Sequence, residues 1–303
     1  MTGMRARDVL MLVGVAVIWG MNFVVIRWGL NSFPPLLFSG LRFALCAVPI
    51  LFGVPRPEIG WRPLLTLGVT LGLLVFSLLY LGIYFGLNAG LASVVMQAQV
   101  FFTILFASAV GLERPKLQTR LAMIIGFCGL ALIALPAGGH VAILGLCLTL
   151  GGAASWGISN VLIKQLPPVR MLNLMVWISI VPPLPLFLLS LVFEGPHAIA
   201  AALSGMGLGG IGSVFYTAVL STLVAYGVWG ALIRKYSNMA VAPYALLVPI
   251  VGMGAAAIFL DRNLTTLDFA GAALTVAALA INAAGHIRHA WFSRRQRLLR
   301  PTP

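Results

Sequence analysis

Apolar residues dominate this chain in long runs that short polar or basic stretches separate at regular intervals. Ten runs have the roughly 17–25 residues that a helix needs to cross a bilayer core of about 30 Å. They lie near residues 9–30, 35–53, 64–87, 91–112, 119–136, 142–163, 171–193, 211–233, 241–260 and 268–286. Because the connections are short, consecutive helices should be antiparallel neighbours. The pattern predicts an all-α multi-pass membrane protein with ten transmembrane helices.

The lysines and arginines divide unequally between the two sets of connections. Of the 19, 16 fall near the chain ends or in alternate connections, all on one side of the predicted membrane. Arg262 alone falls in a connection on the other side, and Arg27 and Arg42 lie within or at the ends of spans. Cytoplasmic loops are enriched in basic residues, so we expect both termini in the cytoplasm. The C-terminal basic residues would form a solvated tail that can contact anionic lipid head groups.

The composition supports a membrane protein and limits the other classes. The chain has 303 residues, of which 61% are hydrophobic and 8% are charged, whereas soluble domains average about 25% charged residues. The net charge of +13 does not indicate nucleic-acid binding, because the cytoplasmic loops account for the basic residues. Paired histidines or carboxylates inside the spans, which haem or metal catalysis would need, are missing from the sequence. We therefore expect no metal, no cofactor and no enzymatic activity.

Two stretches of the first half recur in the second. "VAVIWGMNFVVIRWG" reappears 137 positions later, where Trp156 and Lys164 stand in place of Trp19 and Arg27. Residues 92–114 also align without gaps to residues 240–262. Five helices per half is an odd number, so the second half would enter the membrane from the opposite side, as in alternating-access transporters. The predicted units are a first five-helix repeat at 1–136, a second, inverted repeat at 137–287, and a basic cytoplasmic tail at 288–303.

The chain resembles the ten-helix drug/metabolite transporter superfamily, and within it the EamA-type exporters. The resemblance spans about residues 9–285 and rests on "WGMNFVVIRWGL", "PPLLFSGLRFAL", "GLASVVMQAQVFFTI", "HVAILGLCLTLGGAASW" and "AVAPYALLVPIVG", which look most like the O-acetylserine/cysteine exporters of that family. It implies export of amino acids or related metabolites across the bacterial inner membrane. Related members carry aromatic amino acids and other metabolites. The resemblance therefore predicts the fold more specifically than it predicts the transported substrate.

Polar and aromatic side chains at membrane depth are the candidates for substrate binding, because a polar group there is costly unless it is buried or lines a wet cavity. Several share one helix face, such as Trp19 with Asn22 and Tyr80 with Tyr84. Serines and threonines often bond only their own backbone, and aromatic residues near span ends often serve as interface anchors. The candidates for substrate contact are Trp19, Asn22, Tyr80, Tyr84, Met96, Gln99, Trp156, Ser159, Asn160, Tyr226 and Tyr244.

Five further residues are candidates for gating or structural roles: Arg27, Arg42, Lys164, Pro243 and Pro249. Arg27 and Lys164 end the first helix of each half. Arg42 either snorkels outward, ties helices together or binds a substrate carboxylate. The two prolines interrupt the ninth span, where they either bend the helix for packing or free carbonyl groups for a ligand.

All six acidic residues lie outside the middle of the predicted spans: Asp8, Glu58, Glu113, Glu194, Asp261 and Asp268. A proton-driven carrier needs a titratable group in its pathway. We therefore expect facilitated efflux by alternating access, in which a zwitterionic substrate binds aromatic and amide groups. The alternatives are a drug or other metabolite exporter of the same fold, a proton-coupled antiporter that uses Glu113 or Asp261, and a channel. A complete pathway in one chain favours a functional monomer over a dimer.

Overall fold

The computed structural model describes residues 4–112, 114–135, 140–236, 238–260 and 265–298, and in this part of the chain all regular structure is helical. The first half contains α1 (Ala6–Gly29), α2 (Pro35–Ala47), η1 (Val48–Phe52), α3 (Trp61–Leu67), η2 (Gly68–Leu74), α4 (Val75–Tyr84), α5 (Ala89–Val95), η3 (Met96–Ala98), α6 (Gln99–Ala109) and α7 (Leu117–Ala134). The second contains α8 (His140–Lys164), α9 (Met171–Ile178), α10 (Pro183–Phe193), α11 (Pro196–Ser204), α12 (Leu208–Phe215), η4 (Tyr216–Val224), α13 (Ala225–Tyr236), α14 (Asn238–Val241), η5 (Ala242–Leu246), α15 (Leu247–Phe259) and α16 (Thr266–Leu298).

Eight continuous helical segments of the described chain are long and apolar enough to cross a membrane. They match predicted spans one to six, eight and ten. The seventh prediction corresponds to α9 and α10, which meet at an angle of 40° where Pro182 and Pro183 interrupt the helix. The ninth corresponds to the shorter apolar helix Pro243–Phe259. In its described part, the structure therefore confirms an all-helical chain with multiple candidate spans and bends the seventh at Pro182 and Pro183.

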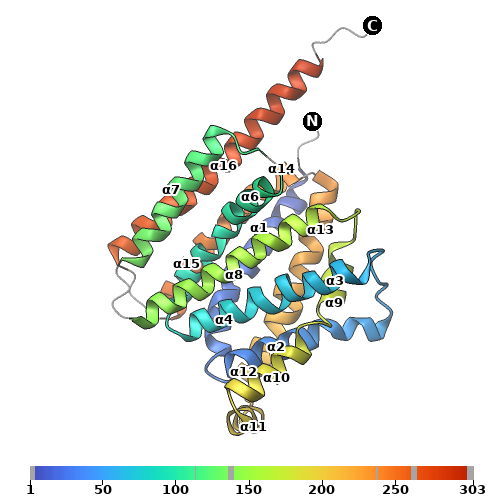
Figure 1. Cartoon of the computed structure of the whole chain (residues 1–303), viewed down its shortest axis with the longest axis vertical. Helices are drawn as coiled ribbons and strands as arrows, with labels where there is room; N and C mark the ends of the chain where they lie inside the picture. The colour runs from blue at the N-terminus through green and yellow to red at the C-terminus, as the bar shows by residue number, and fades with distance from the viewer. Residues whose placement is uncertain (1–3, 113, 136–139, 237, 261–264, 299–303) are drawn as a thin grey trace.

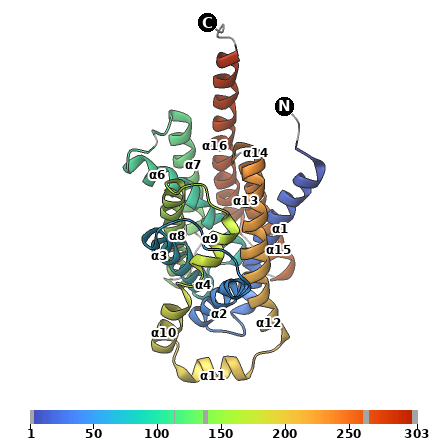
Figure 2. The same cartoon turned by 90° about the vertical axis from the view of Figure 1, so that its right-hand side faces the viewer.

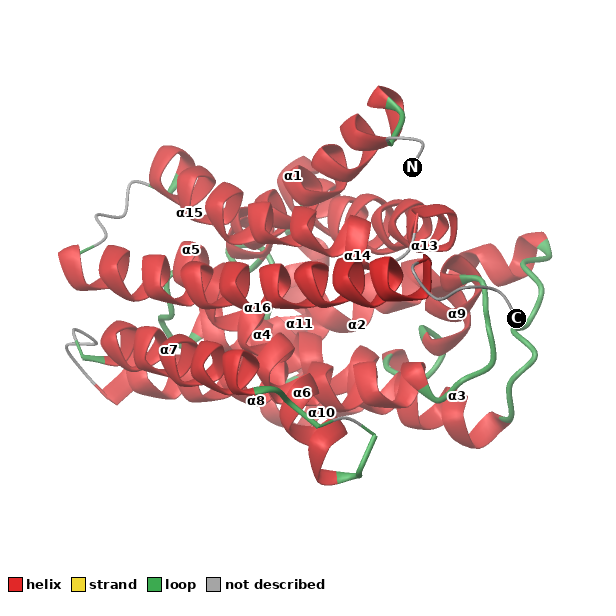
Figure 3. Ribbon diagram, turned by 90° about the horizontal axis from the view of Figure 1, so that it is seen from above, coloured by secondary structure: helices red, strands yellow, loops and turns green. Residues whose placement is uncertain are grey.

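The helices form one bundle in which the start of α1 and the end of α16 lie at the same end, opposite α11 (Figures 1 and 2). Seen from above, α16 runs between α7 and α15 (Figure 3). The short helix α11 lies across the far end of the bundle (Figure 2) and was not predicted from the sequence. The helix α16 also continues through residue 288, where the basic tail was expected to begin, and ends at Leu298.

Several termini have identifiable local causes. The Asn88 side chain accepts hydrogen bonds from Gly90 N and Leu91 N at the start of α5, which is the usual role of an N-cap asparagine. Thr265 and Asp268 bond each other reciprocally before α16, because each side chain accepts from the other's backbone N–H, as in a capping box. At the end of α10, Gly195 has a φ of 84°, a left-handed conformation that glycine adopts without strain.

Two irregular segments recur at one spacing in the two halves. The π-helical segments η2 and η4 begin at residues 68 and 216, 148 positions apart. The same shift carries the 3-10 turn η3, residues 96–98, onto residues 244–246, which lie within the 3-10 segment η5. A shift of 148 is also that of the ungapped alignment between residues 92–114 and 240–262. The halves therefore share backbone irregularities as well as residues.

Candidate functional site

Arg42 occupies the interior of the bundle, where α2, α4 and η4 meet. Its side chain is 0% exposed. The guanidinium donates to Thr222 Oγ1 from Nε at 3.2 Å and from Nη2 at 2.7 Å, and to the Tyr80 hydroxyl from Nη1 at 3.1 Å. Its Cζ also lies 3.7 Å from the centroid of the Phe76 ring, a cation–π geometry. Of the alternatives for Arg42, outward snorkelling is wrong, because the side chain points into the bundle.

Aromatic side chains of α1 and α13 form a cluster beside η4, the segment that contains the Arg42 partner Thr222. The Trp19 ring lies 5.2 Å from that of Tyr226 and 5.1 Å from that of Trp229, between centroids. Trp19 also donates from Nε1 to the Ser221 carbonyl of η4 at 3.0 Å, next to the Thr222 that binds Arg42. Together with Tyr80 and Phe76, these residues form an aromatic–arginine cluster built from both halves of the chain.

The structure describes a second polar group between α6, α8 and η2. Asn160 Nδ2 donates to Gln99 Oε1 at 2.6 Å and to Thr103 Oγ1 at 3.0 Å. Ser159 donates to Thr70 Oγ1 at 2.8 Å. These side chains satisfy one another, so they tie the third, fourth and sixth spans together, and a ligand would have to replace existing hydrogen bonds to contact them.

The remaining candidates take different places. Met96 is buried in the main core and Trp156 packs against it, while Tyr244 packs beside the cluster of Leu12, Leu232 and Val241. Asn22 is buried. Tyr84 was expected at depth but lies at the end of α4 and is 54% exposed, so its predicted depth is wrong. Pro243 begins η5, and Pro249 is buried in α15.

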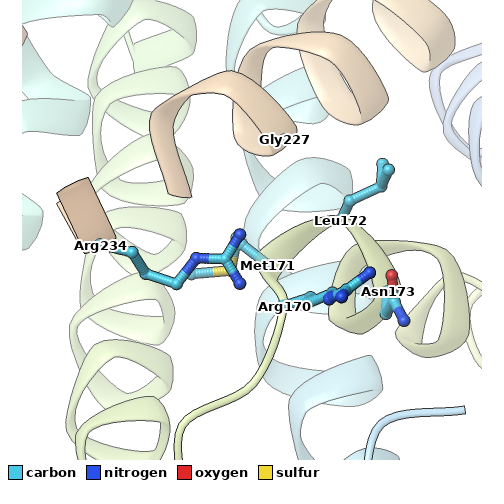
Figure 4. A pocket seen from close by; sticks show the side chains of 6 residues that line it. All are labelled: Arg170, Met171, Leu172, Asn173, Gly227 and Arg234. Carbon is cyan, nitrogen blue, oxygen red and sulfur yellow. The ribbon is translucent and has the colours of Figure 1, made fainter. Parts of the chain in front are cut away.

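A pocket opens at each end of the bundle. One, of about 330 Å³, is lined by Arg170 and the start of α9 together with Gly227 and Arg234 of α13 (Figure 4). Gly227 directly follows Tyr226 in the chain, but the residues that line this pocket do not include members of the aromatic–arginine cluster. The other, of about 430 Å³, lies where α1 and α4 end and includes Arg27 and Tyr84. Lys164, the counterpart of Arg27, ends α8.

The described acidic side chains form no hydrogen bond or ion pair with Arg42. Asp8 accepts from Lys235 Nζ at 2.6 Å. Glu194 accepts from Leu36 N at 2.6 Å and Leu37 N at 3.0 Å, at the start of α2, where a helix dipole favours a negative charge. Glu58 is exposed, and Asp268 caps α16. Glu113 and Asp261 lie outside the described residues.

Sequence reasoning missed three residues of the cluster. Thr222, Trp229 and Phe76 are not among the sequence candidates, and Thr222 Oγ1 both donates to the Thr217 carbonyl of its own segment and accepts from Arg42. All three are defined by contacts across helices that are far apart in the sequence. The one available signal was the spacing of Thr222, Tyr226 and Trp229, which places them on one helix face.

Helices of bilayer length around a largely apolar core that holds a few buried polar side chains define a multi-pass membrane protein. The chain belongs to the EamA-like transporter family, whose model matches it twice, at residues 7–135 and 143–284. It is 40% identical over 288 residues to the "Probable amino-acid metabolite efflux pump" of Salmonella typhimurium, covering 93% of this chain and 96% of that protein. The protein of the same name from Escherichia coli K12 is 39% identical over 290 residues, with the same coverage.

More distant comparisons agree with this family. The "Uncharacterized inner membrane transporter YedA" of Escherichia coli K12 is 29% identical over 266 residues, covering 82% of this chain and 83% of that protein. A solved crystal structure superposes with a TM-score of 0.57 at 15% identity, covering 92% of this chain and 98% of the other. At that identity the superposition supports the fold alone.

Proposed function

We propose that this protein exports amino acids or closely related metabolites across the bacterial inner membrane by alternating access. The observation that carries this is the similarity along almost the whole chain to two proteins named as amino-acid metabolite efflux pumps. The aromatic–arginine cluster supports it, since it offers a cation and aromatic faces at the interface of the two halves. Transporter sites typically lie at such an interface between repeats.

The architecture in this proposal is ten spans in two inverted repeats, with α9–α10 as the seventh span and α14–α15 as the ninth. The double family match and the recurrence of π-helical and 3-10 segments at a shift of 148 support the repeat. An even number of spans agrees with α1 starting and α16 ending at the same end of the bundle. Pockets at opposite ends would then be the two vestibules of one pathway in a functional monomer.

The orientation predicts which surface positions are accessible in cells. The distribution of basic residues among the connections predicts that Arg62 lies in the cytoplasm. It also predicts that α11, which contains His197, lies outside the cell membrane. Both side chains are exposed. We expect His197→Cys to react with a membrane-impermeant maleimide in intact cells, and Arg62→Cys to react only after permeabilisation. The reverse labelling pattern would invert the orientation, and labelling of both in intact cells would contradict the span count.

The candidate substrate residues and the absence of proton coupling are part of the same proposal. The described acids cap helices, pair with a lysine or lie exposed, and none of them contacts the aromatic–arginine cluster. A zwitterion needs no net charge compensation, so neutral amides, aromatic rings and one arginine would bind it. The site would include Trp19, Tyr80 and Tyr226 of the aromatic–arginine cluster. It would also include Gln99, Asn160 and Ser159, which belong to the second polar group between α6, α8 and η2.

Counterflow in proteoliposomes tests the function. Vesicles loaded with unlabelled amino acid are expected to take up labelled cysteine, O-acetylserine, threonine, methionine or phenylalanine faster than empty vesicles do. Collapse of the pH gradient should leave the rate unchanged if transport is facilitative. Exchange that stops with the gradient would favour the antiporter alternative. Exchange of a cationic drug but of no amino acid would keep the family and reject the cargo.

A further inference from the structure

The charge of Arg42 is not neutralised within the part of the chain that the structure describes. Its hydrogen-bond acceptors are the hydroxyl groups of Thr222 and Tyr80, both of which are neutral. The four described carboxylates lie elsewhere, as shown above. Burying a charge with only neutral partners is costly, and an arginine fork is strongly complementary to a carboxylate. The geometry therefore calls for an anion in one state of the protein.

The guanidinium also has bonding capacity to spare. It carries five N–H groups in a planar fork, and three hydrogen bonds to described residues account for three of them. The Phe76 ring covers one face of the plane, so the in-plane direction remains for a further acceptor. Thr222 Oγ1 accepts hydrogen bonds from both Nε and Nη2. It thereby takes the position on this edge of the guanidinium that an oxygen of a bound carboxylate would take.

Two buried polar groups on α1 and α2 have no hydrogen-bond partner in the structure. Ser39 is 0% exposed and its Oγ is unpartnered. It lies one turn before Arg42 on the same face of α2. Cys46, also on this face, has its Sγ 3.4 Å from the Ala218 carbonyl oxygen of η4. Asn22 is 5% exposed and its Oδ1 is unpartnered, one turn after Trp19 on α1. Trp19 bonds Ser221 of η4, so both groups lie on helix faces directed at η4.

Unpartnered buried polar atoms are rare, because each forfeits a hydrogen bond. A hydroxyl beside a guanidinium can donate to a carboxylate, whereas an amide oxygen accepts from an ammonium group. The rings of Trp19, Tyr226 and Trp229 cluster one turn before Asn22 along α1, and aromatic ring faces attract a cation. These groups together match the two charged ends of a free α-amino acid.

We propose that Arg42, with Ser39, binds the α-carboxylate of the transported substrate, and that Asn22 Oδ1 accepts from its ammonium group. Thr222 and Tyr80 hold the guanidinium in place while the site is empty. The inference rests on the proposed function and makes it narrower, because it requires a free carboxylate. Amides and methyl esters of the same amino acids, which lack the anion, would then be poor substrates.

The test compares each exchanged amino acid with its amide as competitor in the counterflow assay, for the wild type and for Arg42→Gln. The wild type is expected to prefer the free acid. Arg42→Gln should raise the half-saturation concentration for the acid about tenfold or more, as expected for losing a charged hydrogen bond, and leave the amide unchanged. Arg62→Gln, which replaces an exposed arginine, is the matched control and should behave like the wild type.

Second variants keep the inference testable if Arg42→Gln does not fold. Arg42→Lys retains the charge without the fork and should keep the preference for the acid at lower affinity. Asn22→Leu should weaken the binding of amino acids but not of the matching deaminated carboxylates. An unchanged acid-to-amide preference in Arg42→Gln, or a wild-type half-saturation concentration for the acid in Arg42→Lys, would overturn the carboxylate site. A wild type that exchanges no amino acid would instead overturn the proposed function itself.

Discussion

Replacement of Trp19 by alanine is expected to reduce amino-acid counterflow to less than about a tenth of the wild-type rate, because this ring joins the two halves of the candidate site. Trp19 contacts Tyr226 and Trp229 and bonds the Ser221 carbonyl. Its loss removes the aromatic face, the hydrogen bond and much of the packing in one step. The measurement is the initial rate of exchange in proteoliposomes at equal protein density.

Two comparisons separate this role from simple loss of folding. Trp61→Ala changes a tryptophan that is 50% exposed and lines neither pocket, and its exchange rate should stay near that of the wild type. Trp19→Phe keeps an aromatic ring but deletes the Nε1–H donor, so it should fold normally and transport at an intermediate rate. Wild-type exchange by a monodisperse Trp19→Ala protein would remove Trp19 from the site.

Alanine at Gly129 or Gly271 should produce a large loss of stability, roughly 1–3 kcal/mol for an overpacked contact. The two glycines face each other across α7 and α16. A Cβ at Gly129 would lie 2.6 Å from the Gly271 carbonyl oxygen, and one at Gly271 would lie 2.5 Å from the Gly129 oxygen. Since the obstacle is backbone, the helices must separate to relieve the contact.

The stability measurement is the temperature at which half of the detergent-solubilised protein remains monodisperse. Gly254→Ala is the matched control, because a Cβ there meets no atom within 4 Å. It should leave the midpoint unchanged or raise it slightly, as alanine is the better helix former. Equal midpoints for all three variants would show that α7 and α16 do not pack as closely in the membrane as the structure indicates.

Much of the candidate site was predictable because its residues are unusual at their positions. An arginine inside an apolar run, or a tryptophan and an asparagine on one helix face, can be recognised from spacing alone. Trp19, Tyr80, Tyr226 and Arg42 do come together. Tyr84 was misplaced because spacing defines a face but not a depth, and α4 ends at that residue.

Other parts of the site depended on features that side-chain periodicity does not encode. Thr222 and Ser221 lie in the π-helical segment η4, and π-helical turns often occur at functional sites. A regular 3.6-residue repeat does not anticipate such a segment. Trp229 lies near a span end, where tryptophans often anchor the interface, yet it packs on Trp19 of α1. Contacts of this kind depend on how helices cross.

The sequence alone determined that this is a helical membrane protein, because so few charged residues cannot make a water-exposed surface and the apolar runs have bilayer length. It also revealed the internal similarity of the two halves and the polar candidates within them. Only the tertiary structure decided which candidates meet, where the prolines bend a span, and that Arg42 faces the bundle interior. These outcomes depend on close packing between distant segments, and helical periodicity specifies a face without specifying its neighbour.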